Sequence, residues 1–158
     1  MLYLVHHGDA VGPDVNPMRP LSERGRAEID LLAQQAAARG AKPDLIWHSG
    51  KMRARQTAEA YLRCCNPLAK CSAARGLQPT DPTEWIVDAI AGDPRHIMLA
   101  GHFPHLPRLL GRLISGTLDA PPRDFPLNGI VALEQEGGRW IEKWRLKPSK
   151  PHSPLSNP

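Results

Sequence analysis

Histidine, serine and glycine follow three short apolar runs of the chain, at the points where those runs end. The three polar segments are His6-His7-Gly8 after residues 2–5, His48-Ser49-Gly50 after residues 45–47, and Gly101-His102 after residues 97–100. A neutral imidazole can attack phosphorus as a nucleophile, and a second imidazole can hold or protonate a phosphoryl oxygen. These residue types predict such chemistry if the fold brings the three segments together.

A group of basic residues follows Ser49. Lys51, Arg53 and Arg55 fall in the first turns of a predicted helix. Cations at this end oppose the helix dipole, which favours anions, so a bound phosphate or sulfate would offset an unfavourable arrangement. A solvated basic surface is the alternative. The neighbouring histidines favour the anion site.

A metal site is a competing interpretation of the same histidines. His102 and His105 are spaced about one helical turn apart, but no trio of Asp, Glu and His has a standard zinc or iron spacing. We therefore expect no metal. Cys64, Cys65 and Cys71 are odd in number and match no zinc spacing, so we expect reduced structural thiols rather than a redox centre.

The elements that must position these residues alternate between strand and helix. Apolar runs at 2–5, 45–47 and 97–100 predict buried parallel strands, and helices are predicted from Ser22 to Gly40 and over about 51–64, 84–91 and 104–115. Residues 129–134 and 140–146 predict a hairpin that turns at 136–138, and residues 72–82 are predicted as a loop. Asn128-Gly129 is predicted as a plain loop, with a turn that borders the site as the alternative. This order predicts an α/β three-layer sandwich, with a mostly parallel central sheet, helices on both faces and a C-terminal hairpin at one edge.

The carboxyl ends of parallel strands lie along one edge of a sheet. Open α/β sheets bind their ligands in the crevice at that edge. We therefore expect His6, His7 and His102 to converge there with the basic helix, although they are far apart in sequence.

Length and composition limit the class of protein. The 158 residues predict one domain over 1–147, followed by a proline-rich tail over 148–158 that we expect to be disordered. The net charge of +4 comes without a long basic run, so we expect no nucleic-acid partner. No run approaches the ~20 apolar residues of a membrane span, and the apolar start lacks a basic region before it. We expect no membrane association and a cytoplasmic protein.

Four segments together resemble a known family. Residues 2–10 resemble the opening strand and Arg-His-Gly-x-Ala signature of the histidine phosphatase (phosphoglycerate mutase-like) superfamily, and residues 19–25 resemble its Arg-Pro-Leu-Thr-x-x-Gly element. Residues 49–58 are similar to its Ser-Pro-x-x-Arg-Ala-x-Gln-Thr-Ala element, and residues 101–104 to its Gly-His-x-Pro element. The order and spacing match over about residues 1–146, and the short bacterial phosphohistidine phosphatases are the most similar members.

The resemblance implies a role for each matching residue. His7 would be the nucleophile that becomes phosphorylated, and His102 the second catalytic histidine. Arg53 would bind the phosphoryl oxygens, and Arg19 would contribute to the same pocket. The family chemistry needs no metal or organic cofactor.

Position 6 departs from the family pattern. The family has an arginine before the nucleophile, and this chain has His6. Histidine offers fewer donors than arginine and titrates near pH ~6.5. We hypothesise that His6 binds phosphate as a cation and shifts the activity optimum to acid pH. A non-catalytic phosphate-binding regulatory module is the alternative that this substitution raises.

A general acid for the leaving group is also missing from its expected place. Residues 76–79 contain no carboxylate, and Asp9, Asp81 and Glu84 read more simply as loop or helix-cap residues. An imidazole leaving group needs less help than an alkoxide, and the short chain has no insertion to form a lid. We therefore expect hydrolysis of phosphohistidine, including phosphohistidine on a protein, through phospho-His7. The alternative enzyme is a small-molecule phosphomonoesterase with the same site, and the partner is a phosphorylated protein or a small phosphorylated substrate.

Overall fold

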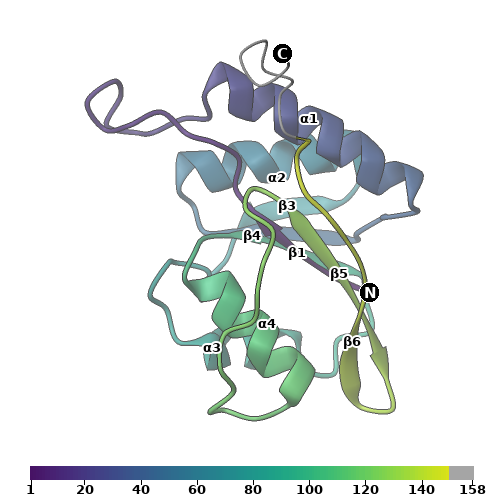
Figure 1. Cartoon of the computed structure of the whole chain (residues 1–158). Coiled ribbons are helices and arrows are strands. Elements are labelled where there is room, and N and C mark those ends of the chain that lie inside the picture. Colours follow the sequence, from purple (N-terminus) through teal and green to yellow (C-terminus); the bar gives the residue numbers. More distant parts are fainter. Residues whose placement is uncertain (150–158) are drawn as a thin grey trace, which may run out of the picture.

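A six-stranded sheet lies between two layers of helices in the computed structural model, which describes residues 1–149 (Figure 1). The elements in chain order are β1 (Leu2–His6), α1 (Glu23–Ala38), β2 (Leu45–His48), α2 (Met52–Cys65), β3 (Lys70–Ala73), α3 (Thr83–Ile90), β4 (Ile97–Gly101), α4 (His105–Ser115), β5 (Ile130–Glu136) and β6 (Arg139–Leu146). Most of the expected disordered tail, from residue 150 onward, lies outside the described residues.

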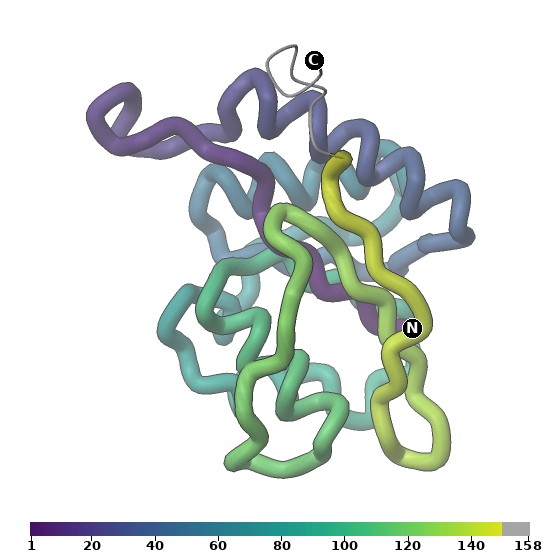
Figure 2. Tube along the Cα trace, viewed as in Figure 1, coloured from purple at the N-terminus to yellow at the C-terminus, as the bar shows by residue number. Residues whose placement is uncertain are grey.

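The strand order β3-β2-β4-β1-β5-β6 places the earliest strand near the middle of the sheet. The β1, β2, β3 and β4 strands run parallel, while β5 is antiparallel to β1 and β6 is antiparallel to β5. The trace in Figure 2 shows the β5–β6 hairpin at one end of this arrangement. The predicted α/β sandwich with a mostly parallel sheet and an edge hairpin is confirmed.

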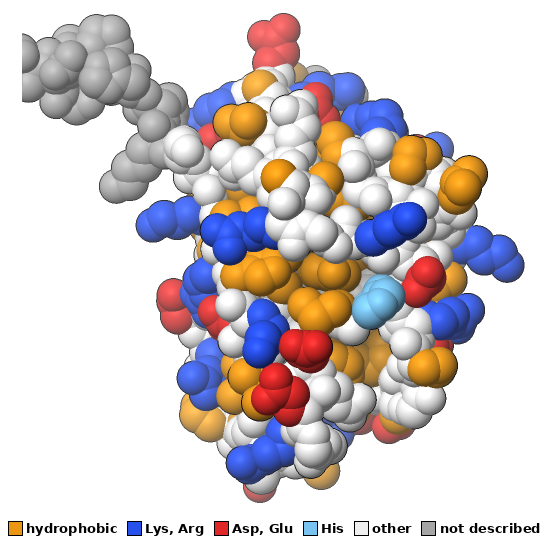
Figure 3. Space-filling model, turned by 90° about the vertical axis from the view of Figure 1, so that its right-hand side faces the viewer, with side chains coloured by type: hydrophobic (Ala, Val, Ile, Leu, Met, Phe, Trp, Pro, Cys, Tyr) orange, Lys and Arg blue, Asp and Glu red, His pale blue; other side chains and the backbone are white. Residues whose placement is uncertain are grey.

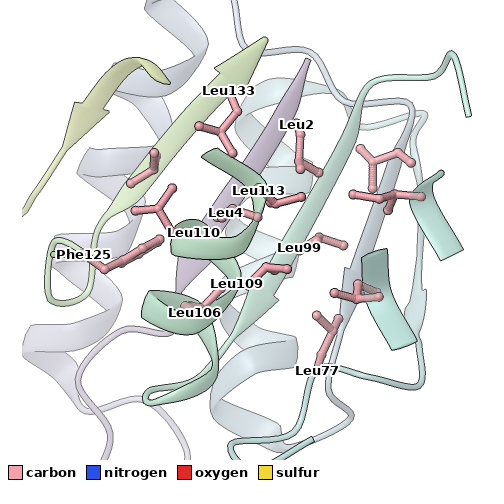
Figure 4. Close-up of a cluster of buried hydrophobic side chains, with 14 of the residues drawn as sticks. Leu2, Leu4, Leu77, Leu99, Leu106, Leu109, Leu110, Leu113, Phe125 and Leu133 are labelled. Atoms are coloured by element: carbon pink, nitrogen blue, oxygen red, sulfur yellow. The ribbon is translucent and has the colours of Figure 1, made fainter. Parts of the chain in front are cut away.

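Both faces of the central strands are buried, which explains why their sequences are continuously apolar. Successive side chains of a strand point to opposite faces. Leu2 and Leu4 therefore join the cluster beneath α4, which includes Leu99, Leu106 and Leu109 (Figure 4). The side chains between them belong to the cluster on the α1 and α2 side, with Tyr3, Val5, Ile29, Leu32 and Met98.

The β3 strand corrects one prediction. We expected residues 72–82 to be a loop, but Ser72 and Ala73 complete a strand that begins at Lys70 and pairs in parallel with β2. This strand lies at the edge of the sheet and its side chains are largely exposed, so its sequence is polar and lacks the apolar run of a central strand.

Close packing between α1 and the loop after β1 fixes the start of the predicted site. The Ser22 hydroxyl accepts the Gly25 N–H and caps α1, as expected. A Cβ atom at Gly25 would lie 2.1 Å from the carbonyl oxygen of Asp9, and one at Gly8 would lie 2.5 Å from a side-chain carbon of Ile29. Glycine at both positions therefore lets the helix press against the segment that follows His7.

The surface carries mixed charges. On the side of the molecule shown in Figure 3, Lys and Arg side chains are interspersed with Asp and Glu side chains around a hydrophobic area. The absence of a nucleic-acid partner stays a prediction. Within residues 1–149, no helix is long and apolar enough to cross a membrane.

Candidate active site

The segments that follow three neighbouring strands lie close together. The β2, β4 and β1 strands are adjacent and parallel, so the segments after them meet at one edge of the sheet. The rings of His7 and His102 have centroids 5.0 Å apart, and those of His6 and His7 are 4.4 Å apart. The structure therefore brings together the three histidines that the sequence placed at this edge.

One ring nitrogen of His7 forms a hydrogen bond with the backbone, which leaves the other ring nitrogen for chemistry. Its Nδ1 lies 2.7 Å from the carbonyl oxygen of Gly8, and because a carbonyl only accepts, Nδ1 must carry a proton. In the neutral ring, Nε2 then holds the free lone pair. Burial is the main cause that lowers the pKa of His7, and the nearby charges of Arg53 and Arg19 lower it further, against opposing effects of Gly8 and Asp9. The geometry favours a neutral imidazole with a nucleophilic Nε2.

His6 is a neutral group in this site, so our expectation of a cation is wrong. The backbone N–H of Asn128 donates to its Nδ1 at 2.8 Å, which leaves any ring proton on Nε2. The ring stacks on Phe103 with centroids 4.0 Å apart and planes 10° apart. Burial, followed by the charges of His7 and Arg53, lowers the pKa of His6 to about 3. His6 can therefore offer a phosphoryl oxygen one neutral N–H donor.

His102 is buried at the end of β4. Its Nε2 lies 2.6 Å from the hydroxyl oxygen of Ser49, which follows the neighbouring strand β2. Burial is the largest cause that lowers the pKa of His102 to about 3, and the charges of His7 and Arg53 contribute. This histidine is also neutral at physiological pH.

Two guanidinium groups supply the positive charge of the site. Arg53 lies in the first turn of α2, and its Nε is buried without a hydrogen-bond partner. Burial lowers the pKa of Arg53, and the charge of Arg19 lowers it further, which places the two cations near each other. The Nε of Arg19 donates to the carbonyl oxygen of Val11 at 3.0 Å. Within residues 1–149 neither arginine forms an ion pair with a carboxylate, an arrangement that suits a bound anion.

Two residues that we did not predict hold these groups in place. The Thr57 hydroxyl accepts the Gly8 N–H at 3.0 Å and donates to the carbonyl oxygen of Arg53 at 2.8 Å, linking the β1 loop to α2. The Asn128 side chain donates to the carbonyl oxygen of His7 at 2.8 Å. For Asn128-Gly129 we favoured a plain loop over a turn that borders the site. The structure has the turn, and Asn128 contacts both His6 and His7.

Backbone conformation also marks the site. Arg19 and Asn128 have φ values of 48° and 56°, and they are the only non-glycine residues with positive φ among the described residues. Left-handed backbone is uncommon outside glycine, and such residues cluster at functional sites. The Asn-Gly pair at 128–129 was the only sequence signal for this turn.

The three carboxylates considered as general acids are engaged elsewhere. Asp9 accepts the Ser22 hydroxyl at 2.6 Å and pairs with Arg24 at 3.1 Å. The other two have single partners: Asp81 accepts the Gln78 N–H at 3.0 Å, and Glu84 pairs with Arg112 at 2.9 Å. All three serve the local structure in the way that loop and cap residues do.

The alternative metal site finds no support in residues 1–149, which contain no group of three or more His, Cys, Asp or Glu side chains able to hold a metal. His105, the partner of His102 in that interpretation, is fully buried, and both of its ring nitrogens lack a hydrogen-bond partner. The three cysteines are free thiols.

Comparison with known proteins agrees with this geometry. Residues 2–85 match the model of the histidine phosphatase superfamily, branch 1. A solved structure from Agrobacterium tumefaciens assigned to phosphohistidine phosphatase SixA is 28% identical, with a TM-score of 0.76 over 94% of this chain and 97% of that one. A protein histidine phosphatase SixA complexed with tungstate is 22% identical, with a TM-score of 0.80 over 93% of this chain and 96% of that one.

A SixA structure from Nakamurella multipartitia is 21% identical, with a TM-score of 0.76 over 94% of this chain and 96% of that one. A search of curated proteins gave no match. The family model covers more than half of the chain and includes the segments that carry His7 and Arg53. The chain therefore belongs to the histidine phosphatase superfamily, branch 1.

Proposed function

We propose that the chain is a phosphatase that hydrolyses phosphohistidine through a covalent phospho-His7 intermediate. The observation that carries this proposal is the hydrogen bond from Nδ1 of His7 to the carbonyl oxygen of Gly8, which leaves Nε2 as the free nucleophile. Arg53 and Arg19, both without an ion-pair partner among residues 1–149, lie near enough to lower the pKa of the same ring. Phosphoryl transfer requires a nucleophile beside positive charges that can bind the phosphoryl oxygens, and no carboxylate among residues 1–149 neutralises these two arginines.

In the first step, Nε2 of His7 attacks the phosphorus atom and forms a new N–P bond. The bond from phosphorus to the substrate imidazole breaks, and its electron pair goes to the leaving nitrogen. When the substrate ring already carries a proton on its other nitrogen, it departs as neutral imidazole without a further proton donor. Arg53 and Arg19 hold the phosphoryl oxygens, and His6 and His102 add neutral N–H donors.

In the second step, water attacks the phosphorus atom of phospho-His7. The N–P bond breaks, His7 regains its lone pair, and inorganic phosphate leaves with the oxygen of that water. The proton released by the water passes to the phosphate oxygens or to solvent. No step needs a redox partner.

Phosphohistidine is favoured over alkyl phosphates because none of the three carboxylates considered as general acids is free of other partners within residues 1–149. Asp9, Asp81 and Glu84 are each held by another residue. An alkoxide leaving group needs a proton from the enzyme, whereas an imidazole that already carries a proton on its other ring nitrogen does not. The similarity to the SixA protein of Agrobacterium tumefaciens supports the same substrate class. We expect a phosphorylated protein or small molecule of the cytoplasm as the substrate.

The test is phosphate release from a phosphohistidine peptide and from a phosphoserine peptide between pH 5 and 8. We expect turnover of the first only, lost in His7→Ala and retained in His96→Gln, which removes an exposed imidazole instead. Faster turnover of phosphoserine would contradict the proposal in favour of a phosphomonoesterase. Binding of inorganic phosphate without any turnover would contradict it in favour of a regulatory module.

A further inference from the structure

The contact between Ser49 and His102 is short and buried. Ser49 follows β2 and His102 follows β4, and these two strands pair in parallel. Both residues are largely inaccessible, with 7% and 2% of their surfaces exposed, and the hydroxyl oxygen lies 2.6 Å from Nε2. One proton lies between these two atoms, and its owner decides whether the other ring nitrogen of His102, Nδ1, carries a proton in the neutral ring.

The other partners of Ser49 decide the direction of this hydrogen bond. The backbone N–H of Lys51 donates to the Ser49 hydroxyl oxygen at 3.3 Å, so that contact uses a lone pair and leaves the hydroxyl proton free. Within residues 1–149, Nε2 of His102 is the acceptor within hydrogen-bond distance of this proton. If Nε2 itself carried a proton, the buried hydroxyl proton would have no acceptor, which costs about 1–3 kcal/mol.

The segment around Ser49 is held from a second side. The side-chain amide of Gln78, in the loop after β3, donates to the carbonyl oxygen of Ser49 at 2.7 Å. This contact fixes the backbone of Ser49 independently of the hydroxyl. The hydroxyl can therefore point at His102 with little freedom to turn away.

We propose that Ser49 is a positioning residue that donates its hydroxyl proton to Nε2 of His102 and thereby holds the ring as the Nδ1–H tautomer. Because Ser49 occupies Nε2, the N–H on Nδ1 would be the donor that His102 can offer to an oxygen of the transferred phosphoryl group. The part of the proposal that concerns phosphoryl binding rests on the proposed function. The tautomer itself does not.

The charges around His102 agree with this neutral role. His6 and His7 face it from the end of β1, while Lys51 and Arg53 face it from the start of α2. None of these groups is an anion, and burial opposes charge on the ring. His102 therefore acts as a fixed neutral donor and does not deliver a proton as an imidazolium.

The direct test is ¹⁵N NMR of the full chain with labelled histidine, with His102→Gln used to assign the His102 signals. We expect wild type and Ser49→Thr to show protonated Nδ1 and unprotonated Nε2. We expect Ser49→Val, which matches threonine in shape but lacks the hydroxyl, and Ser49→Ala to show both tautomers. A protonated Nε2 in wild type, or an unchanged tautomer in Ser49→Val and Ser49→Ala, would overturn the proposal.

Kinetic measurements distinguish a failure of the tautomer assignment from a failure of the proposed function. On a phosphohistidine peptide we expect Ser49→Val to lower kcat about tenfold and Ser49→Thr to restore most of it. Equal kcat values for the two variants, despite different tautomers, would overturn the role of Ser49 in phosphoryl binding. If the wild type turns over no phosphohistidine but shows the Nδ1–H tautomer, the proposed function fails and the assignment of the tautomer stands.

Discussion

Arg53 and Arg19 place positive charge beside His7, and the contacts and burial of His6 and His7 favour neutral rings. His6 accepts a backbone N–H, His7 donates to a carbonyl, and burial lowers the pKa of both rings. His6 thus replaces an always-charged bidentate group by a single neutral donor. In the proposed mechanism, phosphoryl binding by charged groups therefore depends on Arg53 and Arg19.

The pH profile should reflect His7 and not His6. Because the pKa of His7 is lowered from 6.5, the nucleophile stays unprotonated at and above this pH in the free enzyme. Because the proposed first step also needs a protonated substrate ring, we expect kcat/KM on a phosphohistidine peptide, corrected with His7→Ala, to rise as the pH falls from 8 toward 6.5 and to fall again only where His7 itself becomes protonated. His6→Gln should lower the rate and keep the shape of the profile. A rise between pH 7 and 5 that is present in wild type and absent in His6→Gln would restore the cationic role of His6.

Thr57 gives a second prediction for a single residue. Thr57→Val keeps the shape of the side chain but leaves the Gly8 N–H without its acceptor. We expect it to lower the free energy of unfolding by about 1–3 kcal/mol in urea titrations and to reduce kcat as the loop that carries His7 loosens. Thr57→Ser retains the hydroxyl and should stay close to wild type. A loss in Thr57→Ser and none in Thr57→Val would show that the methyl group, and not the hydrogen bond, matters.

Short motifs made part of this site predictable. His7, Arg53 and His102 each follow a buried strand or begin a helix, so sequence and topology together place them at one edge. Thr57 and Asn128 were not predicted as site residues because their roles depend on three-dimensional contacts. Asn128 lies 121 positions from His7, and an Asn-Gly pair commonly forms an ordinary turn.

At the scale of elements, the site depends on how α1 and α2 meet the ends of the central strands. The apolar runs of β1, β2 and β4 were predictable because burial on both faces demands such sequences. The β3 strand was not, since an exposed edge strand needs no apolar pattern. Its pairing with β2 nonetheless leads into the loop from which Gln78 contacts Ser49.

The contact between α1 and the loop after β1 leads to a prediction at this scale. A methyl group at Gly25 would collide with the carbonyl oxygen of Asp9, while a Cβ atom at Gly12 would meet nothing within 4 Å. We expect Gly25→Ala to lower the free energy of unfolding by about 1–3 kcal/mol and to reduce activity by displacing the His7 loop. Gly12→Ala is the matched control and should change neither. A Gly25→Ala variant as stable and as active as this control would contradict the close packing described above.

At the scale of the whole molecule, the buried histidines make stability depend on pH. The pKa of His6 and of His102 is lowered from 6.5 to about 3, mainly by burial. The unfolded chain therefore binds more protons below pH 6.5, and stability that is present above this pH is lost as the pH falls toward 3.

Each of these two histidines should account for a loss of about 2 kcal/mol at pH 5. Urea unfolding at pH 7.5 and pH 5 measures the effect, and His6→Gln should lose about 2 kcal/mol less over the same range. A free energy of unfolding that is equal at the two pH values would contradict the neutral, buried state of these rings.

The covalent intermediate is the most direct test of how the whole molecule works. We would mix the enzyme with a phosphohistidine peptide, quench in alkali within the first turnover, and locate the phosphoryl group by peptide mapping and ³¹P NMR. Because Nδ1 of His7 donates a hydrogen bond to the carbonyl oxygen of Gly8, we expect phosphate on Nε2 of His7. Phosphate on another residue, or on Nδ1, or turnover by His7→Ala at the wild-type rate, would contradict it.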